Sequence, residues 1–256
     1  MKNAIFQFFL NYNGVGKENG HYSEEGIPEW AQYSNAYFKR YAERHDADYF
    51  LFQDRFVNSR SNFFEVLRLY KDEIFDSYNK VLYVDVDVIP KNLEANIFEL
   101  DVKDVAGWPE WRHPEHLLPV NWSATGPLIN RFQKFNAPIV KPKTVQGSIR
   151  MINSGVMLWS KEARLKAREK FFNHEDWFNY RNAWLDKKWV NIGGHSTHCL
   201  DQPFLNANFN RFNFNVMELS NVWNRFPTKK EDYPCNFAHY VGKSRYNIPQ
   251  IFEDIR

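Results

Sequence analysis

Apolar and polar positions along the chain follow two periods, one typical of buried strands and one typical of amphipathic helices. Short runs of consecutive apolar residues predict strands, and the clearest lie at Ala4–Leu10, Asp48–Phe52, Lys80–Pro90, Val102–Trp108 and Met151–Trp159. Uninterrupted apolar runs are typical of strands that are covered on both faces of a parallel sheet.

Helical spacing of apolar residues appears between these runs. It predicts helices at Trp30–His45, Asn62–Tyr78, Lys161–Trp184 and Cys199–Asn208, the last with Asp201 near its N-terminal end. Strands that alternate with helices indicate an α/β fold. The sequence contains no internal repeat, low-complexity tract or clear linker, so we expect a single domain over residues 1–256.

Two aspartates follow the apolar residues of the segment Lys80–Pro90. Asp85 and Asp87 are two positions apart, and residues at i and i+2 of a strand point to the same side. Two carboxylates side by side at the end of a buried strand are unfavourable unless a cation neutralises them. We therefore expect a divalent metal ion here; the alternative is that both residues only cap the turn that follows.

Composition and charge narrow the class of protein. Aromatic residues make up 18 % of the chain, and most are expected in the core, although some rings could stack on sugars or bases. A net charge of +2 without any block of five like charges argues against binding to nucleic acid. The two cysteines, Cys199 and Cys235, form no Cys-x-x-Cys pair, so a reducing compartment fits better than a disulfide scaffold.

No stretch of the sequence approaches the roughly 20 apolar residues that a membrane-spanning helix needs. The apolar segment within Met1–Leu10 is too short for a signal peptide and favours a first buried strand. We therefore expect a soluble, cytoplasmic protein without a membrane span, either bacterial or virus-encoded.

The periodic pattern breaks down between Pro109 and Gly147, a segment rich in proline. A long irregular segment inside a compact domain is often a binding loop. Three tryptophans lie in this segment or directly before it, and their rings are candidates for contacts with an acceptor molecule: Trp108, Trp111 and Trp122.

His239 is the best candidate for a third metal ligand, although a lone histidine is more often structural. It follows a strand-like apolar stretch and precedes Gly242 and Lys243. Glycine lets the backbone approach a phosphate closely, and lysine supplies a positive charge. Two carboxylates and a histidine suit Mn²⁺, and Mg²⁺ is the alternative. Such an ion stabilises a departing diphosphate, the leaving group of a nucleotide-sugar donor.

Five segments, in this order, resemble glycosyltransferase family 8, which includes glycogenin and bacterial lipopolysaccharide galactosyltransferases. They are Arg68 in a predicted helix ending at Tyr78-Asn79-Lys80, Leu82-Tyr83-Val84-Asp85-Val86-Asp87, Asn153-Ser154-Gly155-Val156-Met157-Leu158, Asp201-Gln202-Pro203-Phe204-Leu205-Asn206, and His239-Tyr240-Val241-Gly242-Lys243. Each segment is weak alone, and the shared order carries the resemblance. Taken singly, Asn153-Ser154-Gly155 could be a strand bulge, Asp201 a helix N-cap and Arg68 an exposed helix charge.

The resemblance implies a GT-A fold, which is Rossmann-like, with a mixed, mostly parallel central sheet flanked by helices. Residues 1–90 would form the nucleotide-binding half, and residues 91–256 the donor-sugar and acceptor half. It implies metal-dependent transfer of a sugar, expected from a UDP-hexose, to a glycan or another hydroxyl acceptor, with retention of the anomeric configuration.

The resemblance also assigns residues. The implied sites are metal ligation by Asp85, Asp87 and His239, nucleotide and diphosphate contacts by Asn11, Tyr12, Arg68, Gly242 and Lys243, donor-sugar contacts by Asn153, Ser154 and Gly155, and stabilisation of developing charge by the catalytic candidates Asp201 and Gln202.

The chain departs from the family pattern in two places. Asn11 stands where the family commonly has an aspartate that faces uracil. Lys243 directly follows Gly242, where the family has Gly-x-Lys, and Ser244-Arg245 replace the usual Pro-Trp. Either Lys243 or Arg245 could therefore contact the phosphate.

Two other functions remain open to the same residues. Asp85-Val86-Asp87-Val88 after an apolar strand also resembles the first motif of haloacid-dehalogenase-type phosphatases, in which the first aspartate is a nucleophile. That motif normally opens the chain, and we find no convincing later acidic pair for Mg²⁺. A non-catalytic nucleotide-sugar-binding module would use the same groups as a transferase, and measured transfer or hydrolysis distinguishes the two.

Overall fold

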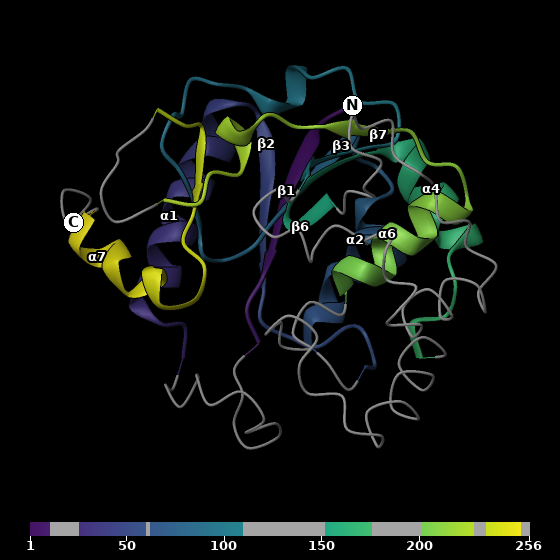
Figure 1. Ribbon diagram of the computed structural model, residues 1–256, viewed down its shortest axis with the longest axis horizontal. Helices are drawn as coiled ribbons and strands as arrows, with labels where there is room; N and C mark the ends of the chain where they lie inside the picture. The colour runs from purple at the N-terminus through teal and green to yellow at the C-terminus, as the bar shows by residue number, and fades with distance from the viewer. Residues whose placement is uncertain (11–25, 60–61, 110–151, 176–200, 228–233, 252–256) are drawn as a thin grey trace, which may run out of the picture.

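A six-stranded sheet forms the centre of the protein, seen in a computed structural model that describes residues 1–10, 26–59, 62–109, 152–175, 201–227 and 234–251 (Figure 1). The strand order is β2-β1-β3-β6-β5-β7. The strands are β1 (Asn3–Phe8), β2 (Ala47–Phe52), β3 (Lys80–Val84), β5 (Val105–Pro109), β6 (Ile152–Ser160) and β7 (Val216–Glu218).

Strand β6 runs against the other five strands. β1 is parallel to β2 and β3, β6 is antiparallel to both of its neighbours β3 and β5, and β7 is parallel to β5. The sheet is therefore mixed and mostly parallel, which confirms the expected α/β class. The direction of β6 also brings its first residues to the sheet edge at which β1, β2 and β3 end.

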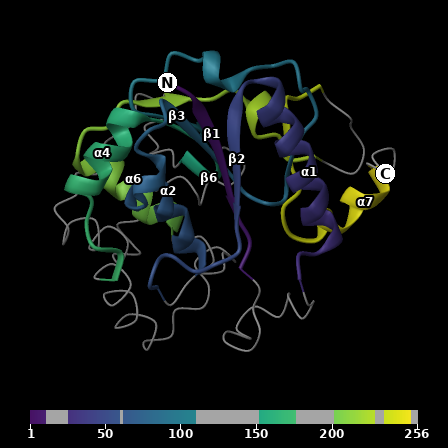
Figure 2. The same cartoon turned by 180° about the vertical axis from the view of Figure 1, so that it is seen from behind.

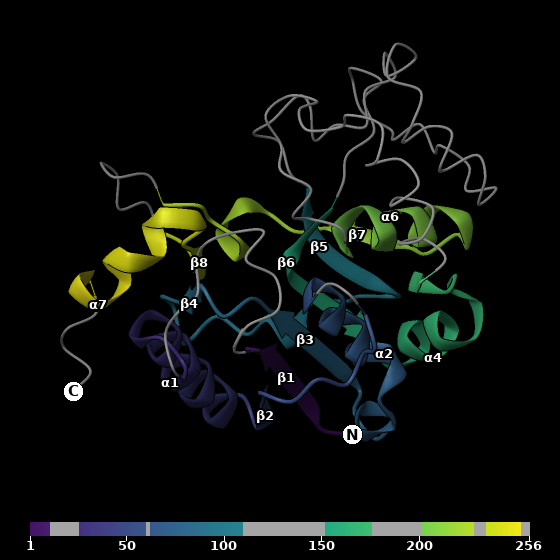
Figure 3. The same ribbon diagram turned by 90° about the horizontal axis from the view of Figure 1, so that it is seen from below.

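Helices cover both faces of this sheet, as Figures 2 and 3 show from two further sides. The α-helices are α1 (Glu29–Arg44), α2 (Arg68–Lys71), α4 (Lys161–Lys170), α6 (Asp201–Arg211) and α7 (Ile248–Ile251). α1 packs on one face, where its residues Phe38 and Tyr41 belong to the same buried cluster as Ile5 and Leu82. α2, α4 and α6 pack on the other, around Phe6. None of the helices among the described residues is long and apolar enough to cross a membrane.

Short 3₁₀ segments connect the main elements. They are η2 (Asn62–Leu67), η3 (Glu73–Phe75), η4 (Ile97–Glu99), η6 (Asn221–Trp223) and η7 (Gly242–Asn247). Most of the aromatic residues that the structure describes are buried or packed against the core, as expected from composition. Trp159, for example, is fully buried and packs against Tyr70, Phe171 and Phe209.

A second, two-stranded sheet joins the middle of the chain to its C-terminal part. β4 (Val88–Pro90) pairs in antiparallel register with β8 (Phe237–His239), so that Val88 lies opposite His239. The backbone N–H of Tyr240 also donates to the carbonyl of Asp87 at 2.8 Å. This small sheet brings His239 next to the Asp85–Asp87 segment.

The segment Lys80–Pro90 is two strands rather than the single strand predicted. β1 pairs with β3 only as far as Phe6 and Tyr83, and the pairing of β3 with β6 ends one residue later at Val84. A turn follows, closed by a hydrogen bond from the N–H of Val88 to the carbonyl of Asp85 at 3.1 Å. Asp85 and Asp87 therefore lie in a turn after the strand, and their carboxylates meet by the shape of that turn rather than by strand periodicity.

The predicted helix Asn62–Tyr78 is broken into η2, α2 and η3. The break lies at Asp72, whose backbone is extended. Its carboxylate accepts hydrogen bonds from Nε of Arg68 at 2.9 Å and from the N–H of Ile74 at 3.0 Å. A short acidic side chain that bonds to nearby backbone competes with helical hydrogen bonds, and here that competition ends α2.

The predicted helix Lys161–Trp184 is also too long. α4 ends at Lys170 because Phe171 adopts an extended backbone and packs against Trp159 and Phe214. The residues after 175 in this prediction lie outside the described residues. Within α4, the buried side chain of Arg164 donates to the carbonyls of Trp159, Phe75 and Tyr78 at 2.7–3.1 Å and so ties α4 to the segment before β3.

Candidate functional site

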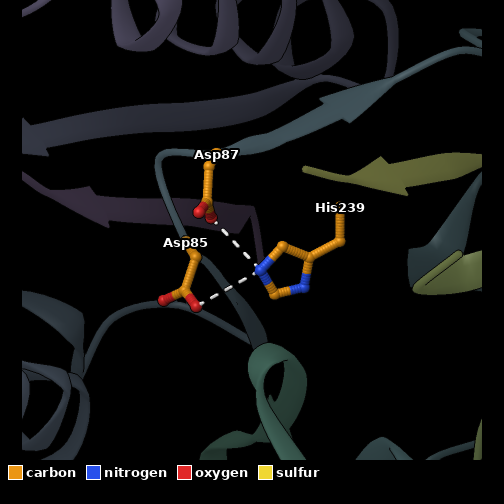
Figure 4. Close-up of side chains that lie close together, drawn as sticks. All are labelled: Asp85, Asp87 and His239. Carbon is orange, nitrogen blue, oxygen red and sulfur yellow. Dashed lines mark ion pairs between the residues drawn. The ribbon is translucent and has the colours of Figure 1, made fainter. Parts of the chain in front are cut away.

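Asp85, Asp87 and His239 converge on one point (Figure 4). Nε2 of His239 lies 3.1 Å from a carboxylate oxygen of Asp87 and 3.7 Å from a carboxylate oxygen of Asp85. One ligand atom from each of the three residues lies within 4.8 Å of the other two. The sequence-predicted ligands therefore meet in space, although His239 is far from the aspartates along the chain.

Burial and like charge make this cluster unfavourable without a cation. Asp87 and His239 are buried, and the side chain of Asp85 is 37 % exposed. Desolvation and the neighbouring charge of Asp87 raise the pKa of Asp85 above its usual value, while His239 and a hydrogen bond from the Tyr83 hydroxyl oppose that rise. A positive charge placed among these atoms would stabilise both carboxylates.

The cluster fits a divalent ion by its chemistry and by its spacing. Two carboxylate oxygens and one imidazole nitrogen form a donor set that suits Mn²⁺. Neighbouring ligands of an octahedral ion at about 2.1 Å stand roughly 3 Å apart. The 3.1 Å and 3.7 Å separations around His239 are close to that spacing.

Gly155 forms the side of the cluster next to His239 and Asp85. Its carbonyl accepts the N–H of Asp85 at 2.9 Å, which holds β6 beside the aspartate turn. A Cβ atom at position 155 would lie 2.4 Å from Cε1 of His239 and 2.8 Å from a carboxylate oxygen of Asp85. Only a glycine leaves room for the cluster here, and this closeness gives a physical reason for the glycine in the Asn153-Ser154-Gly155 segment.

Three hydrogen-bonded side-chain amides connect His239 to the start of α6, and two of them, Asn224 and Gln202, are buried. Nδ1 of His239 lies 2.9 Å from Oδ1 of Asn224, and Nδ2 of Asn224 donates to Oδ1 of Asn153 at 2.9 Å. Nδ2 of Asn153 in turn donates to Oε1 of Gln202 at 3.4 Å, and the N–H of Ser154 donates to the same oxygen at 3.3 Å. Three residues that the sequence suggested for the donor sugar or catalysis are thus connected to the histidine through Asn224.

Asp201 lies at the start of α6 and is buried. Desolvation raises its pKa to about 7, helped by the charge of Asp85 and opposed by hydrogen bonds from Ser154 and from backbone N–H groups at the start of the helix. Asp201 is the first residue of α6, and its carboxylate accepts from backbone N–H groups that helical hydrogen bonds leave free at the helix start. Asp201 therefore binds the start of α6 and also lies close enough to Asp85 to feel its charge.

Among the residues that the structure describes, Arg245 brings a positive side chain to the cluster. Its guanidinium lies 3.1 Å from the second carboxylate oxygen of Asp87 and stacks 4.9 Å from the ring centre of Trp30. Gly242 adopts a positive φ of 60°, and its carbonyl accepts a hydrogen bond from Nε of Arg245 at 2.9 Å. Lys243 follows it and is exposed. Of the two basic residues left open by the sequence, Arg245 is the one held against an aspartate of the cluster.

Arg68 is buried, which contradicts the alternative of an exposed helix charge. Its guanidinium lies over the rings of Phe52 and Phe56, 3.4 Å and 4.9 Å from their centres. It pairs with Asp72 at 2.9 Å and with Asp54 at 3.2 Å. Phe52 ends β2, so Arg68 lies at the same sheet edge as the cluster; a nucleotide contact for it stays a prediction.

Trp108 is buried at 5 % exposure and packs against Phe226. Together with Phe226 and Asn224 it lines a pocket beside His239, whose other lining residues are Pro109, Glu218, Leu219, Ser220, Asn221 and Arg225. Trp108 is therefore a wall of a pocket rather than an exposed stacking surface. The other sequence-predicted residues Trp111, Trp122, Asn11 and Tyr12 lie outside the described residues.

Two residues of the site were missed from the sequence. Asn224 belongs to no recognisable sequence motif, because a single asparagine beside a turn is common in any protein. Phe226 stacks on the imidazole of His239 with 4.8 Å between ring centres and could be anticipated only as a core residue. Both lie in the segment between β7 and β8, whose approach to β6 depends on the tertiary fold.

The chain matches the model of one protein family over most of its length. The model described as Glycosyl transferase family 8 matches residues 20–247 of this chain. A comparison with curated proteins gives no match.

The chain is similar to several solved glycosyltransferase structures. A glycosyltransferase involved in the glycosylation of the major capsid of PBCV-1 superposes with a TM-score of 0.53 at 15 % identity, covering 99 % of this chain and 100 % of that chain. The galactosyltransferase LgtC with donor and acceptor sugar analogs matches at a TM-score of 0.47 and 12 % identity, over 94 % of this chain and 87 % of the other. Mouse xyloside xylosyltransferase 1 matches at 0.48 and 12 %, over 95 % and 99 %. At 15 % identity, the likeness to the first of these structures concerns the fold alone.

Proposed function

We propose that this chain, which belongs to glycosyltransferase family 8, transfers a sugar from a nucleotide-diphosphate donor to a hydroxyl acceptor with the help of a divalent ion. The fold is the GT-A fold that the sequence motifs implied. The observation that carries the metal part of the proposal is the convergence of Asp85, Asp87 and His239 on one point.

The residues proposed to hold the ion are Asp85, Asp87 and His239, with Mn²⁺ as the expected ion and Mg²⁺ as the alternative. When bound, the ion would supply positive charge against the oxygens of the departing diphosphate. The three side chains lie beyond the end of β3, on the sheet edge where ligands of open α/β sheets bind.

A second positive charge near the diphosphate is proposed to come from Arg245. Its guanidinium already stands 3.1 Å from Asp87, so a small movement would let it contact an oxygen of a bound phosphate. Lys243 is exposed and remains a further candidate from the sequence. Gly242, with its positive φ, allows the backbone turn that positions both residues.

The donor sugar is proposed to lie against Asn153, Ser154, Gln202 and Asp201. Asp201 has a pKa near neutrality, so its charge depends on its surroundings in the physiological range. In the retaining reaction that the family implies, Asp201 and Gln202 would stabilise positive charge that develops on the sugar ring. An NMR assay of the product's anomeric configuration tests this, and an inverted product would contradict it.

The acceptor is proposed to enter through the pocket beside His239. The wall formed by Trp108 and Phe226, together with the polar side chains of Asn221 and Asn224, combines ring surfaces with hydrogen-bonding groups, as sugar sites do. An Asn221→Ala variant should raise the KM for the acceptor more than the KM for the donor. A selective loss of donor binding would contradict this placement.

Titration calorimetry with UDP, GDP and other nucleoside diphosphates, with and without Mn²⁺, tests the proposed function directly. The wild type should bind one of them, with UDP expected, and only when Mn²⁺ is present. Asp85→Asn/Asp87→Asn should lose that binding, whereas Asp76→Asn, a carboxylate paired with Arg168 away from the cluster, should keep it.

The same titration separates the alternatives. Absence of nucleotide binding under every metal would remove the basis for a donor site and bring a phosphatase of the haloacid dehalogenase type forward. Binding of a nucleotide sugar without transfer or hydrolysis would identify a non-catalytic binding module. The family match argues against both alternatives.

A further inference from the structure

Asn224 is fully buried and lies between His239 and Asn153, outside the five segments that resemble the family. Its amide has an oxygen and a nitrogen that can exchange places by a flip, so its orientation has to follow from its neighbours. Here the neighbours determine the orientation of the Asn224 amide, because two backbone N–H groups, which can only donate, bind other members of the same row of hydrogen bonds.

The first fixed point is the N–H of Gly155, which is a donor in every protonation state. It lies 2.9 Å from Oδ1 of Asn153, so this oxygen is an acceptor. The atom of Asn224 that lies 2.9 Å from the same oxygen must therefore be the NH₂ group. As a result, Oδ1 of Asn224 faces Nδ1 of His239 at 2.9 Å.

The opposite end of the row gives the same answer. The N–H of Ser154 donates to Oε1 of Gln202 at 3.3 Å, which makes that oxygen an acceptor. Asn153 faces it with its NH₂ group, at 3.4 Å, and so keeps its own oxygen for Gly155 and Asn224. Two backbone donors, Ser154 N–H on Gln202 and Gly155 N–H on Asn153, thus fix the direction of the side-chain hydrogen bonds between Gln202 and His239.

An amide oxygen can only accept a hydrogen bond, so Nδ1 of His239 must carry a hydrogen. In the neutral imidazole this leaves Nε2 as the atom with the lone pair. Nε2 is the atom that lies 3.1 Å from Asp87 and 3.7 Å from Asp85. Without Asn224, the two carboxylates would favour a hydrogen on Nε2, and in that form Nε2 has no lone pair for a metal ion.

The ring of His239 is held in this orientation from its flat side as well. Phe226 stacks on it with 4.8 Å between the ring centres and 24° between the planes. The imidazole is 3 % exposed. Stacking and burial restrict rotation of the ring, and the hydrogen bond to Asn224 decides which nitrogen faces the aspartates.

We propose that Asn224 is a positioning residue, which keeps the Nδ1–H tautomer of His239 and so presents the Nε2 lone pair between Asp85 and Asp87 for a divalent ion. This inference rests on the proposed metal-binding function of the cluster. It adds that the histidine's competence as a ligand is set by an amide that also contacts Asn153, on the side where the donor sugar is proposed to bind.

Two variants of Asn224 separate the tautomer role from a packing role. Asn224→Leu has a similar volume and makes no hydrogen bond, and we expect it to weaken Mn²⁺ binding by about 10–100-fold in calorimetry. Asn224→Asp keeps an oxygen against Nδ1–H and loses the bond to Asn153. It should bind Mn²⁺ within a few-fold of the wild type even if the protein is less stable. Asn224→Ser tests the same point with a smaller change if the leucine variant does not fold.

A matched control is Asn208→Leu. Asn208 is also fully buried and makes two backbone contacts, to Phe204 and Phe172, on the other face of the sheet. This variant should lower stability and leave the affinity for Mn²⁺ unchanged. A loss of affinity in Asn208→Leu equal to that in Asn224→Leu would overturn the proposal, because general loosening would then explain both.

The tautomer itself is read by ¹⁵N–¹H NMR of His239 in the metal-free protein at alkaline pH. The wild type and Asn224→Asp should carry the hydrogen on Nδ1, and Asn224→Leu should carry it on Nε2. A wild type with the hydrogen on Nε2, or an aspartate variant as weak in Mn²⁺ binding as the leucine variant, would overturn the proposal. A wild type that binds no divalent ion would instead overturn the metal site, and the NMR result would still decide the role of Asn224.

Discussion

Gly155 approaches His239 so closely that a methyl group on Gly155 would stand 2.4 Å from the imidazole Cε1. Side chains essentially never come that close, so an alanine here must displace His239, Asp85 or the backbone of β6. Gly155 lies in β6, and His239, a candidate metal ligand, lies in β8. We therefore expect the size of residue 155 to control the geometry of the Asp85, Asp87 and His239 cluster.

Gly155→Ala should therefore lose Mn²⁺ binding and about 1–3 kcal/mol of unfolding free energy. Both quantities can be measured by metal titration and by denaturant unfolding. Gly107→Ala is the matched control, because a Cβ there would lie 2.0 Å from the side chain of Ile152, away from the three ligands. Gly107→Ala should lose stability but keep its affinity for Mn²⁺. Equal metal affinity in Gly155→Ala and the wild type would contradict the prediction.

Arg245 should matter more than Lys243 for binding a nucleoside diphosphate. Its guanidinium is held 3.1 Å from Asp87, whereas Lys243 is exposed. A charge-assisted hydrogen bond contributes about 1.5–3 kcal/mol, so Arg245→Gln should weaken binding of UDP with Mn²⁺ by roughly 10–100-fold. Lys243→Gln should change it by a few-fold at most. Calorimetry on both variants checks this, and the reverse order would return the phosphate contact to Lys243.

Asp201 should make the metal-free protein less stable as the pH rises. Its pKa is about 7 in the folded protein, above its usual value, so the folded state keeps a proton that the unfolded chain has already released. The free energy of unfolding therefore falls as the pH rises from about 4 to about 7, and it stays at the lower value above that range. Asp201→Asn should remove this dependence and gain a few kcal/mol relative to the wild type at pH 8 but little at pH 4.

Denaturant unfolding in the presence of a chelator measures this difference. Asp76→Asn provides a control of opposite sign, because Arg168 holds the pKa of that carboxyl below its usual value. The ion pair with Arg168 stabilises the fold above the pKa that Asp76 has in the unfolded chain, and this stabilisation is lost at low pH. Asp76→Asn should therefore lower the free energy of unfolding at pH 8 and lower it less at pH 3. A pH-independent effect of Asp201→Asn would show that Asp201 titrates normally.

Arg164 should stabilise the fold without any part in the site. It is buried at 1 % exposure, and three backbone carbonyls depend on its guanidinium as a donor. Arg164→Met should cost roughly 2–4 kcal/mol, because these carbonyls would be left without that donor. Arg168→Met on the same helix, whose side chain is 30 % exposed, should cost about 1 kcal/mol or less. Thermal and denaturant unfolding of both variants test the contrast.

Periodicity in the sequence predicted the main strands because their side chains are buried on both faces of the sheet. Ala4 and Phe6 contact one core and Ile5 contacts the other, which is why the run around them is continuously apolar. Periodicity failed where a polar side chain competes with the backbone, as at Asp72, and where an aromatic ring leaves a helix for the core, as at Phe171.

The site was predictable to the extent that its residues carry chemistry of their own. Asp85 and Asp87 were identifiable from their spacing, and His239 from its neighbours, and the three do meet. Asn224 and Arg245 owe their positions to the packing of β8 and of the segments on either side of it, and local patterns do not encode such contacts. Trp108 is mostly covered and yet lines the pocket beside His239, so its contact with an acceptor stays a prediction.

The pairing of β4 with β8 gives a bound ion a second consequence. Asp87 and His239 close a loop of about 150 residues, so an ion shared between them would act as a reversible cross-link in the chain. Protection of the β8 amides from hydrogen exchange, and resistance of the C-terminal segment to proteases, should then rise with the Mn²⁺ concentration. Loss of the ion would loosen the part of the chain that carries His239 before the central sheet unfolds.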